Sequence, residues 1–465
     1  MRPMISWQCL VVLVVLFARQ SEGFAMTPRS RCAVTNVPPW RQGRSFGDGI
    51  SACGVVKARH RGRHSSRRGH GPRDTLSPLF SVQELARVED DVLVVEDEVL
   101  DVEDEVLDVA IVGAGPAGLA LAIGMRSKGL RVKVFEAAPE MADRGAAVFV
   151  QSIGVAKLDE IQPGLAAEAM AAGSPVDSIH LTRPSGETIA RVDMTGLERV
   201  VGYPFLGITR HALQRVLLGH LPEGTVDFGS RLEDLKSREA EGVTEITFKG
   251  CADVVRARAV VGADGRRSVV RKKVLAPKEG NGNWALTWWA LADLPNPITP
   301  AREFRMSYSP KQAIYYGEVE DGVTMWSFTS WHQGEIERDP ELRAGRALAE
   351  LTGWPEEVLN MVRSTPPAKI IEVYVGDSPL QWKTWSRQPG ISLIGDAAHA
   401  MLPTLGMGVT TALQDVVVLT ECIDGMETPL VEALRQYEQK RRIPTALIQF
   451  ASRMAMVFIE NVLCR

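Results

Sequence analysis

Glycines at fixed spacing follow a short apolar run in the stretch "VAIVGAGPAGLALA", residues 109–122. Gly113 permits a tight turn, Gly115 lets the backbone come close to a pyrophosphate, and Gly118 allows a helix to pack against a strand. The start of that helix would meet the phosphate charge with free N–H groups. These residue types predict a turn that binds a dinucleotide.

The elements around this turn can hold it in place. The pattern predicts a strand over 108–112, a helix over about 116–128 and a second strand over 131–136. Glu136 closes the second strand, where an acid accepts hydrogen bonds from the ribose hydroxyls of an adenosine. This order predicts an adenine dinucleotide but does not distinguish FAD from NAD.

A second turn follows the apolar run in "ARAVVGADGRRSVVRKKV", residues 258–274. Asp264 either anchors a dinucleotide or caps a helix in an ordinary turn, and Gly265 lets backbone come close to a ligand. Beside the first turn, this stretch resembles the "DG" motif of FAD-dependent aromatic-ring hydroxylases and related monooxygenases.

A third turn lies in "LIGDAAHAMLPTLGMGV", residues 393–409. Gly395 permits the bend after a buried strand, and Asp396 offers a carboxylate to the ribityl hydroxyls of a flavin. Pro403 shapes the next turn, while Gly406 and Gly408 leave room for the isoalloxazine at the start of a helix. The N–H groups of that helix would stabilise an anionic reduced ring.

In this order the three motifs are similar to those of single-component FAD-dependent monooxygenases, a family that includes zeaxanthin epoxidases and salicylate-hydroxylase-like enzymes. The resemblance covers roughly 108–450 and implies an α/β fold, in which a Rossmann-like FAD-binding domain is interleaved with an α+β substrate domain carrying a mainly antiparallel sheet. It implies that Arg144 and Gln151 lie near the flavin and that Arg210 lies beside the cofactor.

The resemblance also implies the reaction. NAD(P)H binds transiently and reduces FAD, and O₂ then forms a flavin hydroperoxide that delivers one oxygen atom to an apolar or aromatic substrate by hydroxylation or epoxidation. No second GxGxxG occurs, so NAD(P)H has no dinucleotide domain of its own. Because the chemistry belongs to the cofactor, we expect no catalytic side chain. His399 is either a general base or, as we expect, a packed residue beneath the flavin loop.

The substrate class stays open at this point. A carotenoid or another isoprenoid fits an epoxidase-like frame, and a small phenolic acid is the other choice. An FAD-dependent isoprenoid reductase or dehydrogenase without oxygen insertion is the alternative function, and a flavin-bound structural or sensory protein is a further one. Several aromatic residues either line a substrate cavity or form plain core: Trp288, Trp289, Tyr315, Tyr316, Trp326 and Trp331.

The first hundred residues are predicted to be targeting and linker segments rather than part of the enzyme domain. Residues 1–23 resemble a signal peptide, and 24–80 are rich in Arg and Ser and poor in acids, as in an organelle transit peptide. Together they predict a plastid protein. Residues 81–107 repeat an acidic heptad, "VEDEVLD", which is either a solvated linker or a partner-binding helix.

Composition limits the other choices. The basic run lacks aromatic interleaving, so we expect no nucleic-acid partner. The six cysteines contain no CxxC and the eight histidines no HExxH, so we expect neither a disulfide framework nor a metal. Residues 448–465 are predicted to form either a docking helix or a shallow membrane contact. The oligomeric state is not readable.

The predicted boundaries and site follow from these motifs. The FAD-binding domain takes 108–176, 200–283 and 386–465, and the substrate domain takes 177–199 and 284–385. The predicted cofactor-binding residues are Gly113, Gly115, Pro116, Ala117, Gly118, Glu136, Arg144, Arg210, Asp264, Gly265, Gly395, Asp396, Pro403, Gly406 and Gly408.

Overall fold

The computed structural model describes residues 106–141, 146–275, 282–294, 298–331, 334–380, 382, 384, 385, 387–423 and 428–464. These residues all belong to one compact unit. The predicted signal peptide, the transit-like segment and nearly all of the acidic repeat lie outside the described residues, as does Arg144.

The first sheet has a parallel centre and an antiparallel edge. Its main path runs β8-β2-β1-β11-β10-β9, and β17 also pairs with β11. The pairs among β8, β2, β1, β11 and β17 are parallel, whereas β9, β10 and β11 form an antiparallel meander. The strands are β1 (Leu107–Val112), β2 (Val132–Glu136), β8 (Val226–Phe228), β9 (Leu232–Arg238), β10 (Val243–Phe248), β11 (Val254–Gly262) and β17 (Ile391–Leu393).

The sequence of β1 explains its central place. Val109, Ala110, Ile111 and Val112 are all buried, because parallel strands with helices nearby need apolar side chains on both faces. The helices packed around this sheet and the third one are α2 (Pro116–Ser127), α3 (Ser152–Ile161), α4 (Leu165–Ala171), α6 (Arg210–Gly219), α7 (Val269–Leu275), α10 (Asp396–His399), α11 (Gly408–Glu421) and α12 (Leu430–Phe458).

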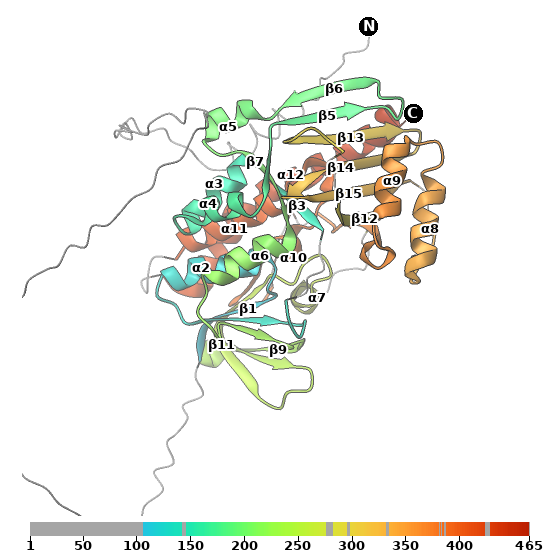
Figure 1. Ribbon diagram of the computed structural model, residues 1–465. Helices are drawn as coiled ribbons and strands as arrows, with labels where there is room; N and C mark the ends of the chain where they lie inside the picture. The colour runs from blue at the N-terminus through green and yellow to red at the C-terminus, as the bar shows by residue number, and fades with distance from the viewer. Residues whose placement is uncertain are drawn as a thin grey trace, which may run out of the picture. The chain divides into compact units, whose positions relative to one another are not determined.

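The second sheet is mainly antiparallel and runs β16-β12-β15-β14-β13-β5-β6. Helices α8 and α9 cover one of its faces (Figure 1), where Trp288 and Phe328 pack with Leu351 and Val358. Its elements are β5 (Ser178–Thr182), β6 (Thr188–Asp193), β12 (Gly282–Asp293), β13 (Glu303–Ser309), β14 (Gln312–Glu320), β15 (Val323–Ser330), β16 (Ile371–Asp377), α8 (Pro340–Glu350) and α9 (Glu356–Ser364).

A small third sheet, β3-β7-β4, lies near the second sheet through the contact of β7 with β14. It is formed by β3 (Ala147–Val150), β4 (Ser174–Val176) and β7 (Phe205–Thr209), and α5 (Thr195–Val201) precedes β7. Short helical turns complete the chain: η1 (Glu239–Glu241), η2 (Pro367–Lys369), η3 (Pro403–Leu405) and η4 (Ile459–Leu463).

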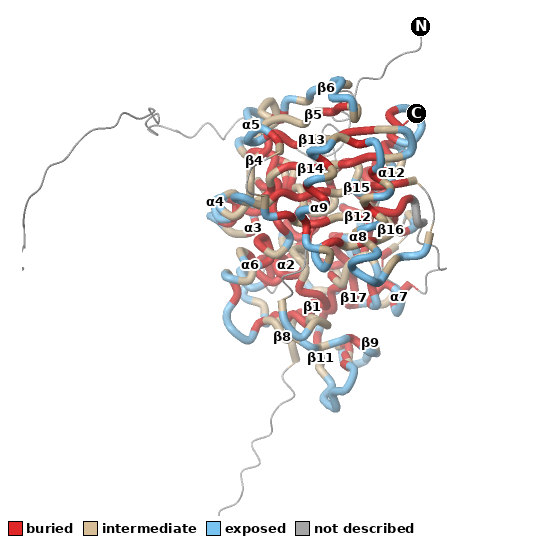
Figure 2. Tube along the Cα trace, turned by 45° about the vertical axis from the view of Figure 1, so that its right-hand side comes forward, coloured by how far each residue is buried: buried red, intermediate tan, exposed pale blue. Residues whose placement is uncertain are grey.

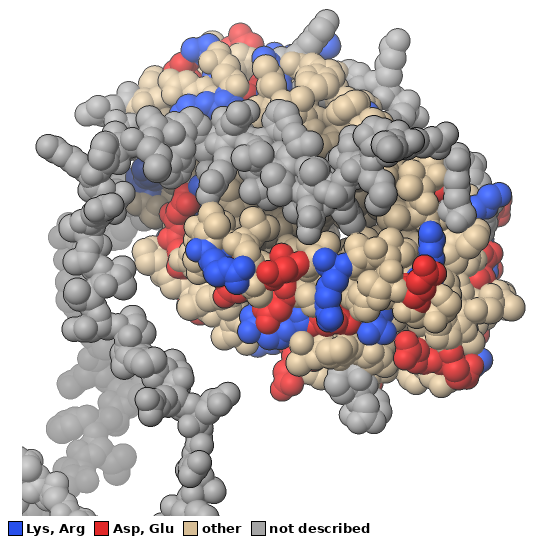
Figure 3. Space-filling view, turned by 90° about the horizontal axis from the view of Figure 1, so that it is seen from above, with Lys and Arg blue, Asp and Glu red and all other residues tan. Residues whose placement is uncertain are grey.

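Burial follows the sheets. Figure 2 shows the buried residues concentrated along the strands, with exposed residues on the outer loops and on the meander around β9. On the face seen in Figure 3, basic and acidic side chains are interspersed, so opposite charges largely offset each other there.

Candidate functional site

The three predicted turns leave the carboxyl ends of three neighbouring parallel strands. Val112 at the end of β1 pairs with Gly262 of β11, and Gly262 also pairs with Leu393 of β17. A Cβ placed on Gly395 would lie 3.4 Å from the Cβ of Ala117, so the third turn touches the first. Ligands of such α/β sheets bind at this edge of the sheet.

The glycines of the first turn have two different roles. Gly113 has φ +110°, and an added Cβ there would lie 2.6 Å from the carbonyl oxygen of Ala263. A Cβ on Gly118 would lie 2.0 Å from the carbonyl oxygen of Gly113, so these two glycines let the turn close. Gly115 is different, because its nearest atom would be Nη2 of Arg210 at 3.5 Å. The open side of Gly115 is therefore the place where a ligand can approach the backbone.

Glu136 ties the first turn to the second strand. Its Oε2 accepts a hydrogen bond from the Ala114 N–H at 2.8 Å, and its Oε1 accepts one from the Ala138 N–H at 2.9 Å. Gln214 donates to the Ala114 carbonyl at 2.7 Å. The carboxylate is thus fixed beside the turn with acceptor capacity remaining. A ribose contact stays a prediction.

In the second turn Asp264 caps α7. Its carboxylate accepts hydrogen bonds from the Ser268 hydroxyl at 2.5 Å and from the Val269 and Val270 N–H groups at 2.6 and 3.1 Å. The ordinary reading of this turn, a helix cap, is therefore present, and a cofactor contact of Asp264 stays a prediction. Gly265 has φ +74°, a left-handed conformation in which the chain turns after Asp264.

Arg271 connects the second turn to the third. Its buried guanidinium donates to the carbonyl oxygens of Asp396 and Ala397 at 3.1 and 2.8 Å, and also to that of Arg266. Burial lowers the pKa of Arg271, and the charges of Asp264 and Asp396 oppose that shift. The residue fixes the relative position of α7 and α10.

Asp396 is the first residue of α10, and its side chain faces the cavity described below. Asp396 is exposed to solvent where it lines that cavity. Desolvation by the surrounding protein atoms raises the pKa of the Asp396 carboxyl, while the charges of His399, Arg266, Arg210 and Arg271 act to lower it. An anion held among these cations is suited to accept hydrogen bonds from hydroxyl groups.

A buried charged network supports the third turn from behind. Asp415 of α11 accepts from the Gly395 N–H at 3.0 Å, pairs with His399 Nε2 at 2.6 Å and accepts from Arg441 Nε at 2.8 Å. Burial alone would raise the pKa of Asp415, but His399 and Arg441 hold it below its ordinary value. His399 is thus packed and hydrogen-bonded beneath the loop, as the sequence predicted. Sequence reasoning missed Asp415 and Arg441.

Two helices begin at the site without side-chain caps. Gly115 precedes α2 and Met407 precedes α11, and neither accepts a capping hydrogen bond through a side chain. Gly406 turns the chain at φ +60°, and Gln151 donates to the Leu405 carbonyl at 3.1 Å. The N–H groups at both helix starts therefore remain available to a polar or anionic ligand.

One cavity of about 1040 Å³ joins these elements to the second sheet. Arg266 and Arg267 also line it, and sequence reasoning did not select them although they directly follow Gly265. Gly113, Gly118, Glu136, Asp264 and Gly395 are not among its lining residues. The predicted residues that do line it are Gly115, Pro116, Ala117, Arg210, Gly265, Asp396, Pro403, Gly406 and Gly408.

The aromatic residues divide between cavity and core. Trp289, Tyr315 and Trp331 line the cavity. Trp288, Tyr316 and Trp326 belong to the core under α8 and α9 instead. The division follows from the alternation of side chains along a strand, which sends neighbours such as Trp288 and Trp289 to opposite faces. Each of the two readings left open by the sequence therefore applies to half of the set.

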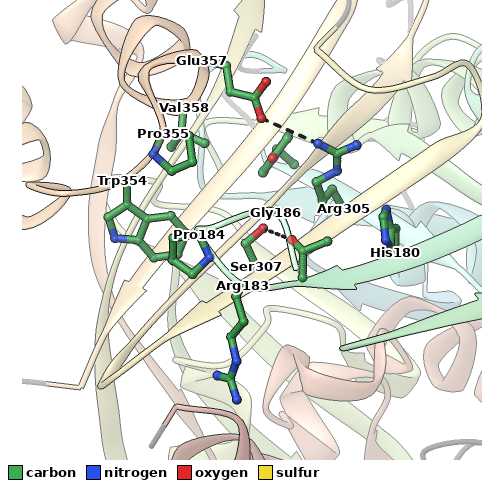
Figure 4. Close-up of a pocket in the computed structure, with 12 residues that line it drawn as sticks. His180, Arg183, Pro184, Gly186, Arg305, Ser307, Trp354, Pro355, Glu357 and Val358 are labelled. Atoms are coloured by element: carbon green, nitrogen blue, oxygen red, sulfur yellow. Dashed lines mark hydrogen bonds and ion pairs between the residues drawn. The ribbon is translucent and has the colours of Figure 1, made fainter. Parts of the chain in front are cut away.

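A smaller pocket of about 100 Å³ lies on the other face of the second sheet. Figure 4 shows Arg305 directed toward Glu357 there, 3.6 Å away, while Arg183 points away. Arg305 also pairs with Glu303 at 3.1 Å. This pocket is too small for a dinucleotide and its central cation is already paired, so the large cavity is the candidate site.

Comparisons with known proteins agree with this geometry. The family model of the FAD binding domain matches residues 106–451. The chain is 31% identical over 356 residues to 3-amino-4-hydroxybenzoate 2-monooxygenase of Streptomyces cremeus, covering 74% of this chain and 86% of that protein. It is 28% identical over 369 residues to chloroplastic zeaxanthin epoxidase of Oryza sativa subsp. japonica, covering 75% of this chain but only 55% of that protein.

A solved structure has the same fold. Klebsiella pneumoniae HpxO, complexed with FAD and uric acid, matches with a TM-score of 0.70 at 21% identity, covering 76% of this chain and 89% of that one.

Proposed function

We infer the function from one premise: this chain belongs to the FAD binding domain family, and its relatives are FAD-dependent monooxygenases. It is therefore an oxidoreductase that binds FAD. We propose that it uses NAD(P)H and O₂ to hydroxylate or epoxidise an apolar or aromatic substrate. The observation that carries this proposal is the continuous cavity that runs from the three turns to the apolar face of the second sheet.

The residues present fit an FAD in this cavity. The space beside Gly115 would receive the pyrophosphate, with Arg210 and the start of α2 as its positive partners. Asp396 would accept hydrogen bonds from the ribityl chain, and the uncapped start of α11 would face the ring. When bound, FAD supplies the electron transfer and the oxygen chemistry.

Side chains of the second sheet would form the substrate part of the cavity. Phe304, Met306 and Met325 line the cavity with apolar surface and would exclude water from the reacting atoms. Burial raises the pKa of Tyr315, so its phenol stays protonated and can donate a hydrogen bond. These groups orient a substrate rather than exchange protons with it.

The lining of the cavity defines the substrate further. Trp289, Tyr315 and Trp331 add aromatic surface to the apolar side chains of the cavity. We therefore propose an apolar or aromatic substrate. A carotenoid or another isoprenoid is our first choice, and a phenolic acid is the second.

The proposed reaction predicts coupled consumption of both co-substrates. A matching substrate should accelerate NAD(P)H oxidation by about tenfold or more over the substrate-free rate. The reason is that a bound substrate completes the site and holds the reacting groups in their productive geometry. Oxygen uptake should match NAD(P)H oxidation, and ¹⁸O from labelled O₂ should appear in the product. Substrate reduction or desaturation without oxygen uptake would instead identify the alternative reductase or dehydrogenase.

Asp396→Ala should weaken FAD binding about tenfold to 100-fold, because charge-assisted hydrogen bonds to the flavin side of the cofactor would be lost. Flavin absorbance per mole of purified protein measures this effect. Asp227→Ala is the matched control, because Asp227 on β8 is a partly exposed carboxylate that pairs with Lys133 and does not line the cavity. Wild-type flavin content in the Asp396 variant would show that this carboxylate does not contact FAD.

We also propose that the protein works in a plastid. The signal-like and transit-like composition of residues 1–80 supports this address. The similarity to a chloroplastic zeaxanthin epoxidase is consistent with it.

A further inference from the structure

One face of the last helix, α12, carries apolar side chains that point outward. Seven of them are 37–52% exposed and lie at helical spacing along one face, which we call the α12 row. At 1.5 Å per residue the row is about 28 Å long. Its members are Ile443, Leu447, Phe450, Met454, Val457 and Phe458 of α12 and Val462 of η4.

The opposite face of α12 is buried and includes several polar side chains among its apolar ones. Arg441 pairs with Asp415 there, and Gln449 donates to the carbonyl oxygens of Ser378 and Ala400 at 2.6 and 2.7 Å. Thr445 and Ser452 on the same face are also buried. Turning the row inward would break these buried hydrogen bonds and leave the charge of Arg441 unpaired. The apolar face is therefore held toward the outside by the polar one.

These contacts also decide how the helix can meet a membrane. The segment Leu430–Leu463 is long and apolar enough to cross a bilayer, and it is the one such helix found among the described residues. However, α12 packs on α11 and η3, and its buried face carries the network beneath the third turn. The helix can thus lie along a bilayer surface while staying attached to the rest of the protein.

The charges along this segment largely offset one another. Arg442 pairs with Glu438, and Arg453 pairs with Asp377. Lys440 and Glu460 are exposed near the two ends of the row and carry opposite charges. The row therefore has no net charge that would oppose contact with a lipid surface.

The row also lies next to the candidate site. Met456 and Ile459 line the large cavity, and Val457 and Phe458, between them in sequence, belong to the row. One helical segment thus separates the outer apolar surface from the cavity. An apolar substrate dissolved in a bilayer would be concentrated on that outer side.

We propose that the α12 row docks this protein on the surface of a lipid bilayer, with the substrate cavity held close to the lipid. Docking itself requires neither FAD nor turnover. The role in substrate delivery rests on the proposed function, and a vesicle-binding assay tests docking independently of it.

The test uses a chain that begins at residue 103, so that the apolar leader cannot contribute to binding. The folded part is suitable because residues 103–465 lie in one compact unit with its own hydrophobic cores. Flotation with vesicles of equal parts phosphatidylcholine and phosphatidylglycerol should carry the protein to the lipid fraction. Phe450→Glu combined with Met454→Glu should reduce the bound fraction about tenfold or more.

The matched control places the same charges elsewhere on the surface. Val200 and Leu342 are 62% and 63% exposed on α5 and α8, so Val200→Glu combined with Leu342→Glu should float like the wild type. Failure of the wild type to float, or equal flotation of the row variant, would overturn the proposal. A wild-type dimer that the row variant converts to a monomer would also overturn it, because a second copy of the chain would then cover the row.

Discussion

A Gly115→Val variant should fold normally but bind FAD about 100-fold more weakly or worse. Gly115 has φ −70° and ψ 172°, a backbone conformation that valine adopts readily. The added side chain would meet no protein atom closer than 3.5 Å, measured from its Cβ. It would instead fill the space proposed for the pyrophosphate. Flavin content and the melting temperature of the flavin-free protein measure the two parts of this prediction.

The neighbouring glycine supplies the control. Gly118→Ala should lower the melting temperature as well as the flavin content, because its Cβ would lie 2.0 Å from the Gly113 carbonyl oxygen. The two variants therefore separate loss of the ligand from loss of the fold. Full flavin content in Gly115→Val would mean that the pyrophosphate does not lie against this turn.

An Asp415→Asn variant should lower the free energy of unfolding by about 3–5 kcal/mol. Arg441 is only 2% exposed, and the substitution would leave its charge without a buried counterion. The hydrogen bond to His399 would also lose its charged acceptor. Urea unfolding of the flavin-free protein measures the change without interference from cofactor binding.

The pH dependence of this effect has a definite sign. Because the pKa of Asp415 is lowered in the folded protein, its stabilising contribution is fully present above the unfolded value of about 3.9. The contribution is lost as the pH falls through the lower folded pKa. The stability difference between wild type and Asp415→Asn should thus be constant near neutral pH and should shrink only in strong acid.

A double variant tests whether the stability lost in Asp415→Asn comes from the unpaired charge of Arg441. Arg441→Met added to Asp415→Asn removes the uncompensated charge, so much of the lost stability should return. If Arg441→Met gives no recovery, the effect of Asp415→Asn does not come from the unpaired arginine.

The sequence alone determined the local parts of the site. The first turn and its flanking strand, helix and strand are predicted from neighbouring residues, because tight turns and helix starts depend on local backbone preferences. Observed α2 covers Pro116–Ser127 where a helix over about 116–128 was predicted, and Thr209 caps α6 by accepting from the Ala212 N–H. The family resemblance added the fold class and FAD as the cofactor. The sheet topology confirms the fold class, and the family match supports FAD binding.

Which of these parts meet, and which way their side chains face, depends on packing between segments far apart in the sequence. Parallel pairing of β1, β11 and β17 brings together turns far apart in sequence, and no local preference encodes that pairing. The sequence also cannot assign Trp288 and Trp289 to core or cavity. Strand alternation places them on opposite faces, but the packing of the sheet determines which face lines the cavity. Asp415 and Arg441 look like ordinary helical charges in the sequence. Their buried contact exists because α11 and α12 pack against each other, and that packing also leaves the α12 row facing outward.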